Sequence, residues 1–283
     1  MLHGVISTYN NSPGMLAECF ESISVFDQST DSQMAKNLLL KFPNLVVTEN
    51  SGHSLSHYFR YIIDNYYNLS GYLVFLKSNV VPRHIDKKTF DKCIDLVNQQ
   101  SGYVSFFNDQ SFKDKIRIAY HVYPGLFLER NNSWYMKGHT NQFFDSFNQL
   151  LTFVYVNPMI PEFVPFTPGG CFGVSSSQVR RIPIEVWKFL SEITTYKFFP
   201  AEAYLVERFL YILLHAPYDF QPYFYEESKN WQMQLRQLSD EKMKETEKSR
   251  MFSGRKFERL RNFAYDLLVR LESKIRFELD SHF

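Results

Sequence analysis

Short apolar runs alternate with amphipathic segments over roughly the first hundred residues, and this alternation limits the fold more than any other feature of the chain. Runs with the composition of β-strands cover residues 2–8, 25–26, 44–50 and 71–79. Helical patterns occupy residues 32–42 and 54–69 between them. Strands that alternate with helices predict a mostly parallel twisted sheet flanked by helices. We therefore expect an α/β fold.

The second half of the chain has a less regular pattern. Residues 111–168 are rich in aromatic residues and dotted with prolines, which is typical of a segment that builds a binding cleft. Residues 169–183 read as a strand and turn that open a helix, and residues 200–216 predict a strong helix. Pro217 ends that helix.

The composition changes near residue 226, so we expect a domain over residues 1–225 and a helical tail over 226–283. In the tail, a highly charged helical segment precedes Gly254, and an amphipathic pattern follows it. The apolar positions of that pattern are Phe257, Leu260, Ala264, Leu267, Leu271 and Ile275. One expectation is that this amphipathic tail packs on the domain or on a second copy of the chain in a homodimer. Alternatively, it docks on an anionic membrane surface through Arg255, Lys256, Arg259, Arg261, Arg270 and Lys274.

Charge and cysteine usage exclude some classes of protein. The formal net charge of +1 argues against nucleic acid as the main partner, because tracking phosphates normally requires a basic excess. Cys19, Cys93 and Cys171 are too sparse for a disulfide framework or a zinc site. We see no signal peptide and no apolar run of about 18 residues, the length that a membrane-spanning helix requires. We therefore expect a cytoplasmic protein, peripheral at a membrane if the tail binds lipid.

Polar side chains follow the predicted strands where each one ends. In parallel α/β sheets, ligands bind beyond the carboxyl ends of the strands. Ordinary turns would also place polar residues there: Asp27 would then cap a turn, and His57 on the next helix would be a hydrogen-bonded core histidine. The ligand-binding interpretation selects Thr8, Tyr9, Asn10, Asp27, Asn50, Gly52, His53, Lys77, Ser78 and Asn79.

Three stretches at these strand ends resemble family-2-like GT-A glycosyltransferases. "VISTYNNSPGMLAECFESI" resembles their opening, in which a strand ends at a Thr-Tyr-Asn turn under the nucleotide. "VFDQSTD" is similar to their second-strand signature, whose aspartate contacts the base. "LVFLKSNVVP" lies where those enzymes keep the aspartate pair that binds a metal. The resemblance implies a GT-A-like (Rossmann-like) domain that binds a nucleotide-sugar.

A second resemblance extends further along the chain. "ENSGHSLSHYFRYIIDNYYNLSGYLVFLKSN" is similar to the Asn-x-Gly…His-x-Tyr…Tyr-x-x-Leu…Phe-Leu block of the uncharacterised DUF3431 family. "PGGCFGVSSSQVRRIP" and "AEAYLVERFL" resemble later blocks of that family. Together the resemblances cover roughly residues 4–215 and leave the tail unexplained.

The resemblances imply a glycosyltransferase of glycan or polysaccharide biosynthesis, with a UDP-sugar as the expected donor and a saccharide or glycolipid as acceptor. In such an enzyme the departing diphosphate must be neutralised. Lys77, helped by His53, Ser78, Asn79 or Arg83, would do this without a metal. The alternative is Mn²⁺ or Mg²⁺ bound by acids elsewhere, for which Asp109 is the nearby contender.

An inverting transfer also requires a base for the acceptor hydroxyl. Glu202 is our candidate, because it falls in the first turn of the helix after the glycine-rich segment. We expect Glu207 instead to form an ion pair with Arg208. The acceptor would lie against Gly169, Gly170 and Cys171, with Trp134, Tyr135 or Phe172 as a stacking face.

The absence of the aspartate pair leaves two rivals open. One is a non-catalytic GT-A-like module that binds a nucleotide or glycan, or acts as a scaffold. The other is a nucleotidyltransferase, although the chain lacks an early glycine-rich phosphate loop.

Overall fold

A computed structural model of the protein describes residues 1–51, 53–99, 102–107, 119–122, 126–131, 141–198, 200–225 and 230–252. By its internal contacts the chain divides into two units, Met1–Gln232 and Met233–Phe283. The candidate site lies in the first unit.

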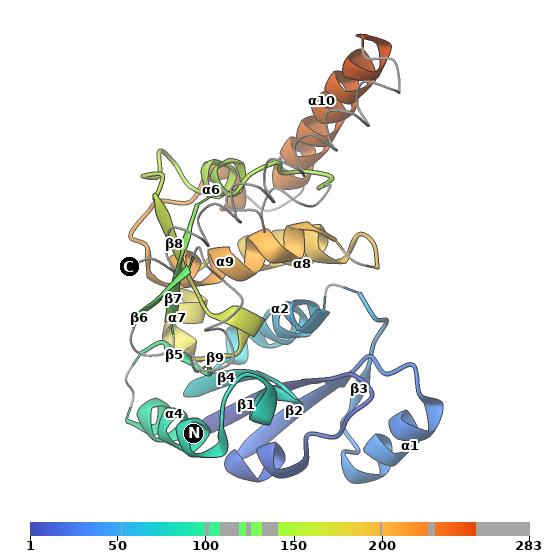
Figure 1. The fold of residues 1–283 in the computed structure, drawn as a ribbon, viewed down its shortest axis with the longest axis vertical. Helices are drawn as coiled ribbons and strands as arrows, with labels where there is room; N and C mark the ends of the chain where they lie inside the picture. The colour runs from blue at the N-terminus through green and yellow to red at the C-terminus, as the bar shows by residue number, and fades with distance from the viewer. Residues whose placement is uncertain are drawn as a thin grey trace, which may run out of the picture. The chain divides into compact units, whose positions relative to one another are not determined.

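The first unit is built on a six-stranded sheet with the strand order β3-β2-β1-β4-β9-β5 (Figure 1). Its strands are β1 (Leu2–Thr8), β2 (Ser22–Asp27), β3 (Val46–Val47), β4 (Tyr72–Lys77), β5 (Val104–Ser105) and β9 (Phe172–Ser175). The first four strands in this order pair in parallel, whereas β9 runs antiparallel to both of its neighbours. The α/β prediction with a mostly parallel sheet is confirmed.

Helices cover both faces of this sheet (Figure 1). On one face lies α2 (His53–Asn65), which packs against β1 and against α8 (Ile184–Thr195), and α8 in turn contacts α9 (Glu202–His215). The other face carries α1 (Ser32–Lys41), α4 (Lys87–Asn98) and the 3₁₀ turn η1 (Gly14–Cys19). Asp31 caps α1 by accepting from the backbone N–H of Gln33 and Met34.

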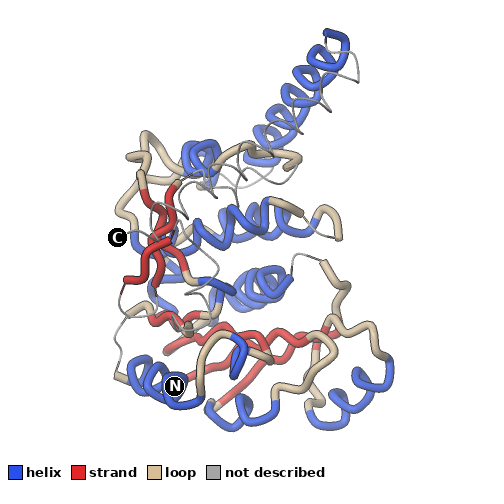
Figure 2. The backbone as a smooth tube through the Cα atoms, viewed as in Figure 1, coloured by secondary structure: helices blue, strands red, loops and turns tan. Residues whose placement is uncertain are grey.

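A smaller antiparallel sheet was not predicted. It contains β6 (Ala119–Val122), β7 (Leu126–Arg130) and β8 (Phe163–Phe166), and Figure 2 shows it as a group of strands apart from the main sheet. α9 packs against β8, and α6 (Phe147–Val154) packs against α9. The remaining short elements are η2 (Tyr66–Asn68), α3 (Val80–Arg83), η4 (Pro168–Gly170), α7 (Ser176–Arg180) and η5 (Pro222–Phe224).

The centre of the main sheet is apolar on both faces. Val5 and Ile6 of β1 and Val74, Phe75 and Leu76 of β4 have no exposed surface. Both faces are covered by helices, so these strands are continuous apolar runs and do not alternate between apolar and polar residues. The burial of these runs fixes the two strands at the middle of the unit.

The helical tail is described only in part. α10 (Asn230–Phe252) confirms that the charged segment before Gly254 is helical. The amphipathic pattern from Phe257 to Ile275 lies outside the described residues. No helix in the described ranges is both long enough and apolar enough to cross a bilayer.

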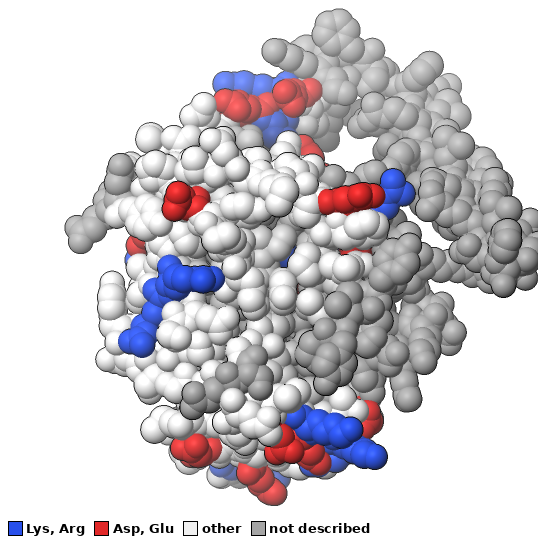
Figure 3. Space-filling model, turned by 90° about the vertical axis from the view of Figure 1, so that its left-hand side faces the viewer, with Lys and Arg blue, Asp and Glu red and all other residues white. Residues whose placement is uncertain are grey.

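Charged side chains of both signs are interspersed on the face that Figure 3 shows. Lys, Arg, Asp and Glu lie close together there, and broad uncharged areas separate the groups. The mixture agrees with the balanced composition of the chain, which has 31 basic and 30 acidic residues.

Leu76→Ala is expected to lower the free energy of unfolding by about 2–5 kcal/mol, because it leaves a cavity between β1, β4 and α4. Leu76 is fully buried in the core cluster. Leu40→Ala is the matched control, since Leu40 is 84% exposed, and it should change stability by less than about 0.5 kcal/mol. Urea unfolding of the two variants measures the difference, and equal costs would contradict this description of the core.

Candidate functional site

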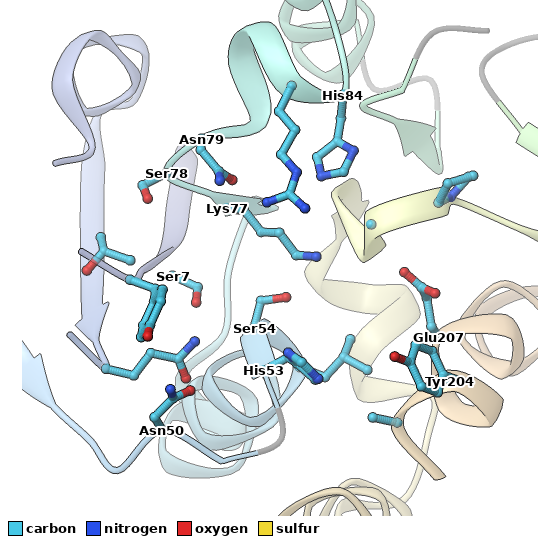
Figure 4. Close-up of a pocket in the computed structure, with 18 of the residues that line it drawn as sticks. Ser7, Asn50, His53, Ser54, Lys77, Ser78, Asn79, His84, Tyr204 and Glu207 are labelled. Carbon is cyan, nitrogen blue, oxygen red and sulfur yellow. The ribbon is translucent and has the colours of Figure 1, made fainter. Parts of the chain in front are cut away.

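The order of the strands places a crevice between the ends of β1 and β4. From β1 the chain moves outward through β2 and β3, and then returns to the opposite side of β1 to form β4. At such a reversal the connections leave in opposite directions, so the carboxyl ends of the two strands border an open space where ligands bind. A cleft of about 750 Å³ opens there (Figure 4).

Most of the sequence-predicted site residues line this cleft. Eight of them do so: Thr8, Tyr9, Asn50, His53, Lys77, Ser78, Asn79 and Gly169. Gly52 lies outside the described residues, as do Asp109, Trp134 and Tyr135.

One wall of the cleft carries positive charge. Lys77 at the end of β4 and Arg83 in α3 both line it, and within the described ranges neither side chain forms an ion pair. The rings of His53 and His84 stand on the same side, around the Lys77 ammonium group (Figure 4). Such a wall suits an anion with several oxygen atoms.

Both histidines of this wall are held toward their neutral form. Burial, followed by the charge of Lys77, lowers the pKa of His53. Burial lowers the pKa of His84 to about 4, and the charges of Lys77 and Arg83 contribute. The Nε2 atom of His84 is buried and has no hydrogen-bond partner among the described residues. An anion that binds in the cleft would offset the repulsion between the positive charges of this wall, and it would accept hydrogen bonds from the side chains there.

The amino end of α2 adds to the positive potential. His53, Ser54 and Leu55 line the cleft at the start of this 13-residue helix. The first backbone N–H groups of a helix have no partner within the helix, and the helix dipole places a partial positive charge there. His53 takes a positive φ of 55°, a conformation that is uncommon for residues with a side chain.

The opposite wall presents a carboxylate. Glu207 and Tyr204 of α9 line the cleft, and in Figure 4 the Glu207 carboxylate and the Lys77 ammonium point toward one another across it. Arg208 Nη1 donates to Glu207 Oε2 at 3.1 Å, which confirms the predicted ion pair. Arg208 Nε also donates to Glu129 Oε2 at 2.8 Å, and the guanidinium lies 4.5 Å from the centre of the Phe166 ring.

Glu202, our sequence candidate for the base, is placed elsewhere. Its side chain is fully buried and is not among the residues that line the cleft. Oε1 accepts from the Phe143 N–H at 2.8 Å and Oε2 from the Tyr196 hydroxyl at 2.6 Å. Both oxygens are thus engaged within the protein. This geometry does not support a base at residue 202, and the carboxylate that α9 turns into the cleft belongs to Glu207.

Asp27 and Asn10 build the rim of the cleft and do not line it. Asp27 is fully buried, and its Oδ1 accepts from the hydroxyl and backbone N–H of Ser29 and from the hydroxyl of Thr8 at 2.7 Å. Asn10 Oδ1 accepts from the backbone N–H of Thr30 and Asp31. The sequence shows that the strands end in polar residues, but it does not show which of these residues line the cleft.

Sequence reasoning overlooked several residues of the cleft. The additional polar and aromatic ones are Ser7, Asn11, Gln28, Ser54, His84, Phe166, Phe198 and Tyr204. Gln28 is the neighbour of Asp27, and its Oε1 is buried without a hydrogen-bond partner among the described residues. The one sequence signal that could have identified Gln28 as a cleft residue is its position at the same strand end as Asp27. His84, Phe198 and Tyr204 come from segments without a strand-end signal.

The glycine-rich segment closes the cleft by close backbone packing. Gly169 has a φ of 83°, and a β-carbon there would lie 3.1 Å from the His84 ring. Gly170 and Cys171 do not line the cleft: the Cys171 thiol is buried and accepts from the Lys77 N–H at 3.4 Å. Phe172 is only 2% exposed, so it cannot stack on a ligand.

No metal-binding cluster is evident in the part of the chain that the structure describes. Among those residues, no three side chains of His, Cys, Asp or Glu come together in a group that could hold an ion.

A buried histidine supports the floor of the cleft. His57 Nδ1 lies 2.8 Å from Ser7 Oγ and Nε2 lies 2.6 Å from Thr48 Oγ1, and the ring stacks on Phe26. Burial lowers the pKa of His57 to about 4, with Arg60 lowering and Asp27 raising it. The prediction of a hydrogen-bonded core histidine is confirmed.

The pKa of His57 predicts a loss of stability in acid. Between about pH 6.5 and pH 4 the unfolded chain binds a proton that the folded protein does not, so acid favours unfolding. A pKa lowered from its ordinary value of 6.5 to about 4 corresponds to about 3 kcal/mol across that window. Urea unfolding at pH 7, 5 and 4 should show a weaker pH dependence for His57→Gln than for the wild type. The same slope in both proteins would refute this role.

Comparison with known proteins gives one match. A family model described as "Protein of unknown function (DUF3431)" matches residues 25–216, well over half of the chain. The comparisons with curated proteins and with solved structures give no match. The matched segment includes the end of β2, all of β4 and α9, and most of the residues that line the cleft. The chain therefore belongs to the DUF3431 family.

Proposed function

We propose that the protein is a glycosyltransferase that moves a sugar from a nucleoside-diphosphate donor to a saccharide or glycolipid acceptor, and that its domain is GT-A-like. The observation that carries the proposal is the opposition of two walls in one cleft. Cationic side chains around Lys77 stand on one side, and the Glu207 carboxylate faces them from the other (Figure 4). An inverting transfer of a sugar uses both kinds of group, cations for the departing diphosphate and a carboxylate for the proton of the acceptor hydroxyl.

The cationic wall is suited to the diphosphate of the donor. As the bond between the anomeric carbon and the phosphate oxygen breaks, negative charge grows on the leaving group. Lys77 and Arg83 are available to stabilise that charge, because neither is paired with a carboxylate within the described ranges. His53, His84 and the amino end of α2 supply further hydrogen-bond donors.

The cleft also has a suitable size. Its volume of about 750 Å³ falls within the usual range for small-molecule sites, roughly 300–1,000 Å³. We assign the end of β1 and the start of α2 to the nucleotide, with Thr8, Tyr9 and Asn50 as contacts. UDP is the expected nucleotide on the strength of the family-2-like motifs.

We assign the base to Glu207. In an inverting step, Glu207 takes the proton of the acceptor hydroxyl, the acceptor oxygen forms a bond to the anomeric carbon, and the nucleoside diphosphate leaves toward Lys77. Arg208 and Glu129 hold the carboxylate in place. The carboxylate oxygens of Glu202 accept hydrogen bonds from Phe143 and Tyr196, and we assign this residue a structural role.

One observation favours a different function. The ion pair between Glu207 and Arg208 would also explain Glu207 as a purely structural residue. In that case the cleft belongs to a non-catalytic module that binds a nucleotide or glycan. Such a module would bind nucleotides without ever transferring a sugar.

Lys77→Met is expected to weaken the binding of UDP at least tenfold, because a charge-assisted hydrogen bond to a phosphate is lost, at a cost of about 1.5–3 kcal/mol. Thermal shift and calorimetry with UDP, with and without EDTA, give the measurement. Uridine, which has no phosphate, should bind both proteins alike. Lys88→Met is the control, since Lys88 lies on α4 outside the cleft. Wild-type affinity for UDP in Lys77→Met would contradict the proposal that the cationic wall binds the diphosphate.

Glu207→Gln is expected to lower kcat by roughly 10²–10⁴, the usual contribution of a general base, and to leave the affinity for UDP unchanged. Glutamine keeps the size of the side chain and can still accept from Arg208. A transfer assay with a panel of UDP-sugars provides kcat, and Glu192→Gln on α8 is the control. Full activity in Glu207→Gln would exclude this base. Tight binding of UDP without transfer to any acceptor would favour the non-catalytic module.

A further inference from the structure

Phe198 is the most exposed aromatic side chain among the described residues that line the cleft. Its side chain is 70% exposed, whereas Phe166 is 2% exposed and lies beneath Arg208. Singly exposed aromatic residues are ordinary at protein surfaces, and Tyr67 is one such residue in this chain. Phe198 differs from Tyr67 because it lines a polar cleft.

The loop that carries Phe198 is held in place by a buried carboxylate. Two residues before Phe198, the Tyr196 hydroxyl donates to Glu202 Oε2 at 2.6 Å. The Tyr196 ring packs edge-on against Phe143 at 5.3 Å, and Glu202 Oε1 accepts from the Phe143 N–H. This contact gives the fully buried Glu202 a purpose: it anchors the loop between α8 and α9. An anchored loop can present its aromatic ring at a small cost in conformational entropy.

Phe198 lies in the loop that leads into α9, the helix that carries Glu207. This loop and α9 both line the cleft, and α9 also supplies Ala203 and Tyr204. The nucleotide side of the cleft has an exposed ring of its own, Tyr9, which is 46% exposed at the end of β1. Exposed rings thus stand at the ends of two different elements that border one cleft, as a site for two substrates would require.

The surroundings of Phe198 match a sugar better than a lipid chain. The other apolar residues of the cleft are nearly buried, namely Leu55, Phe166, Pro168 and Ala203. A lipid chain requires contiguous exposed apolar surface, and among its described residues this cleft offers two exposed rings, Phe198 and Tyr9, on different elements. A pyranose has an apolar C–H face that can pack on an aromatic ring, and hydroxyl groups at its edge that can donate to a carboxylate such as that of Glu207.

We propose that Phe198 is the stacking platform of a saccharide acceptor subsite, and that the Glu202–Tyr196 contact holds this platform beside Glu207. The identification of this subsite as an acceptor site rests on the proposed function. Saccharide binding itself can be measured without any transfer reaction.

The test measures saccharide binding to the full chain by saturation-transfer NMR in the presence of UDP. The probes are maltotriose, cellotriose, chitotriose and mannotriose. We expect at least one of them to bind the wild type, Phe198→Ala to bind it about tenfold more weakly, and Phe198→Tyr to keep the binding. Tyr67→Ala should behave as the wild type, and UDP should bind Phe198→Ala unchanged, which shows that the variant is folded.

Three results would overturn the subsite. They are wild-type saccharide affinity in Phe198→Ala, no binding of any of the four probes, and binding to neutral or anionic phospholipid vesicles that requires Phe198. A failure of the proposed function looks different, because UDP would then fail to bind while a saccharide still bound through Phe198. Tyr196→Phe gives a second check: loss of the contact with Glu202 should weaken saccharide binding and leave UDP affinity intact.

Discussion

The parallel pairing of β1 with β4 is the constraint on which the rest of the structure depends. The two strands are joined in register from Leu2 opposite Tyr72 to Ser7 opposite Lys77. Their central residues are fully buried because helices cover both faces of the sheet. A shift of this register by one residue would place the apolar side chains of both strands against different neighbours along their whole length. The pairing therefore also fixes which polar residues meet at the carboxyl edge.

Charge is distributed across the cleft in an unequal way. The side near Lys77 has cations without carboxylate partners in the described ranges, and the side near Glu207 has the Arg208–Glu129 ion pair at its back. Arg208 and Glu129 are each about 1% exposed, and burying such a pair costs desolvation free energy that good geometry must offset. Here the Phe166 ring and the carbonyl of Tyr204 complete the surroundings of the guanidinium. A buried pair of this kind keeps the carboxylate of Glu207 in a defined position.

The residues that sequence reasoning placed correctly follow buried strands. Thr8 and Lys77 end long apolar runs, so their position at the carboxyl edge could be predicted. Asp27 ends a strand in the same way, yet it turns inward to Thr8 and Ser29, and Gln28 lines the cleft in its place. Glu202 lies in the first turn of α9, and its side chain faces Phe143 and Tyr196. Position in the first turn of a helix does not tell which direction the side chain faces.

The sequence alone determined the alternation of strands and helices, and with it the α/β class and the polar edge of the sheet. These features arise from local periodicity and from the burial of apolar runs, and both can be read along the chain. The tertiary structure decided that β9 enters the sheet antiparallel between β4 and β5, and that α9 brings Glu207 opposite Lys77. Such contacts join residues that are far apart in the sequence, such as Ser105 with Phe172 and Tyr72 with Ser175. They depend on how whole layers pack, and no local pattern carries that information.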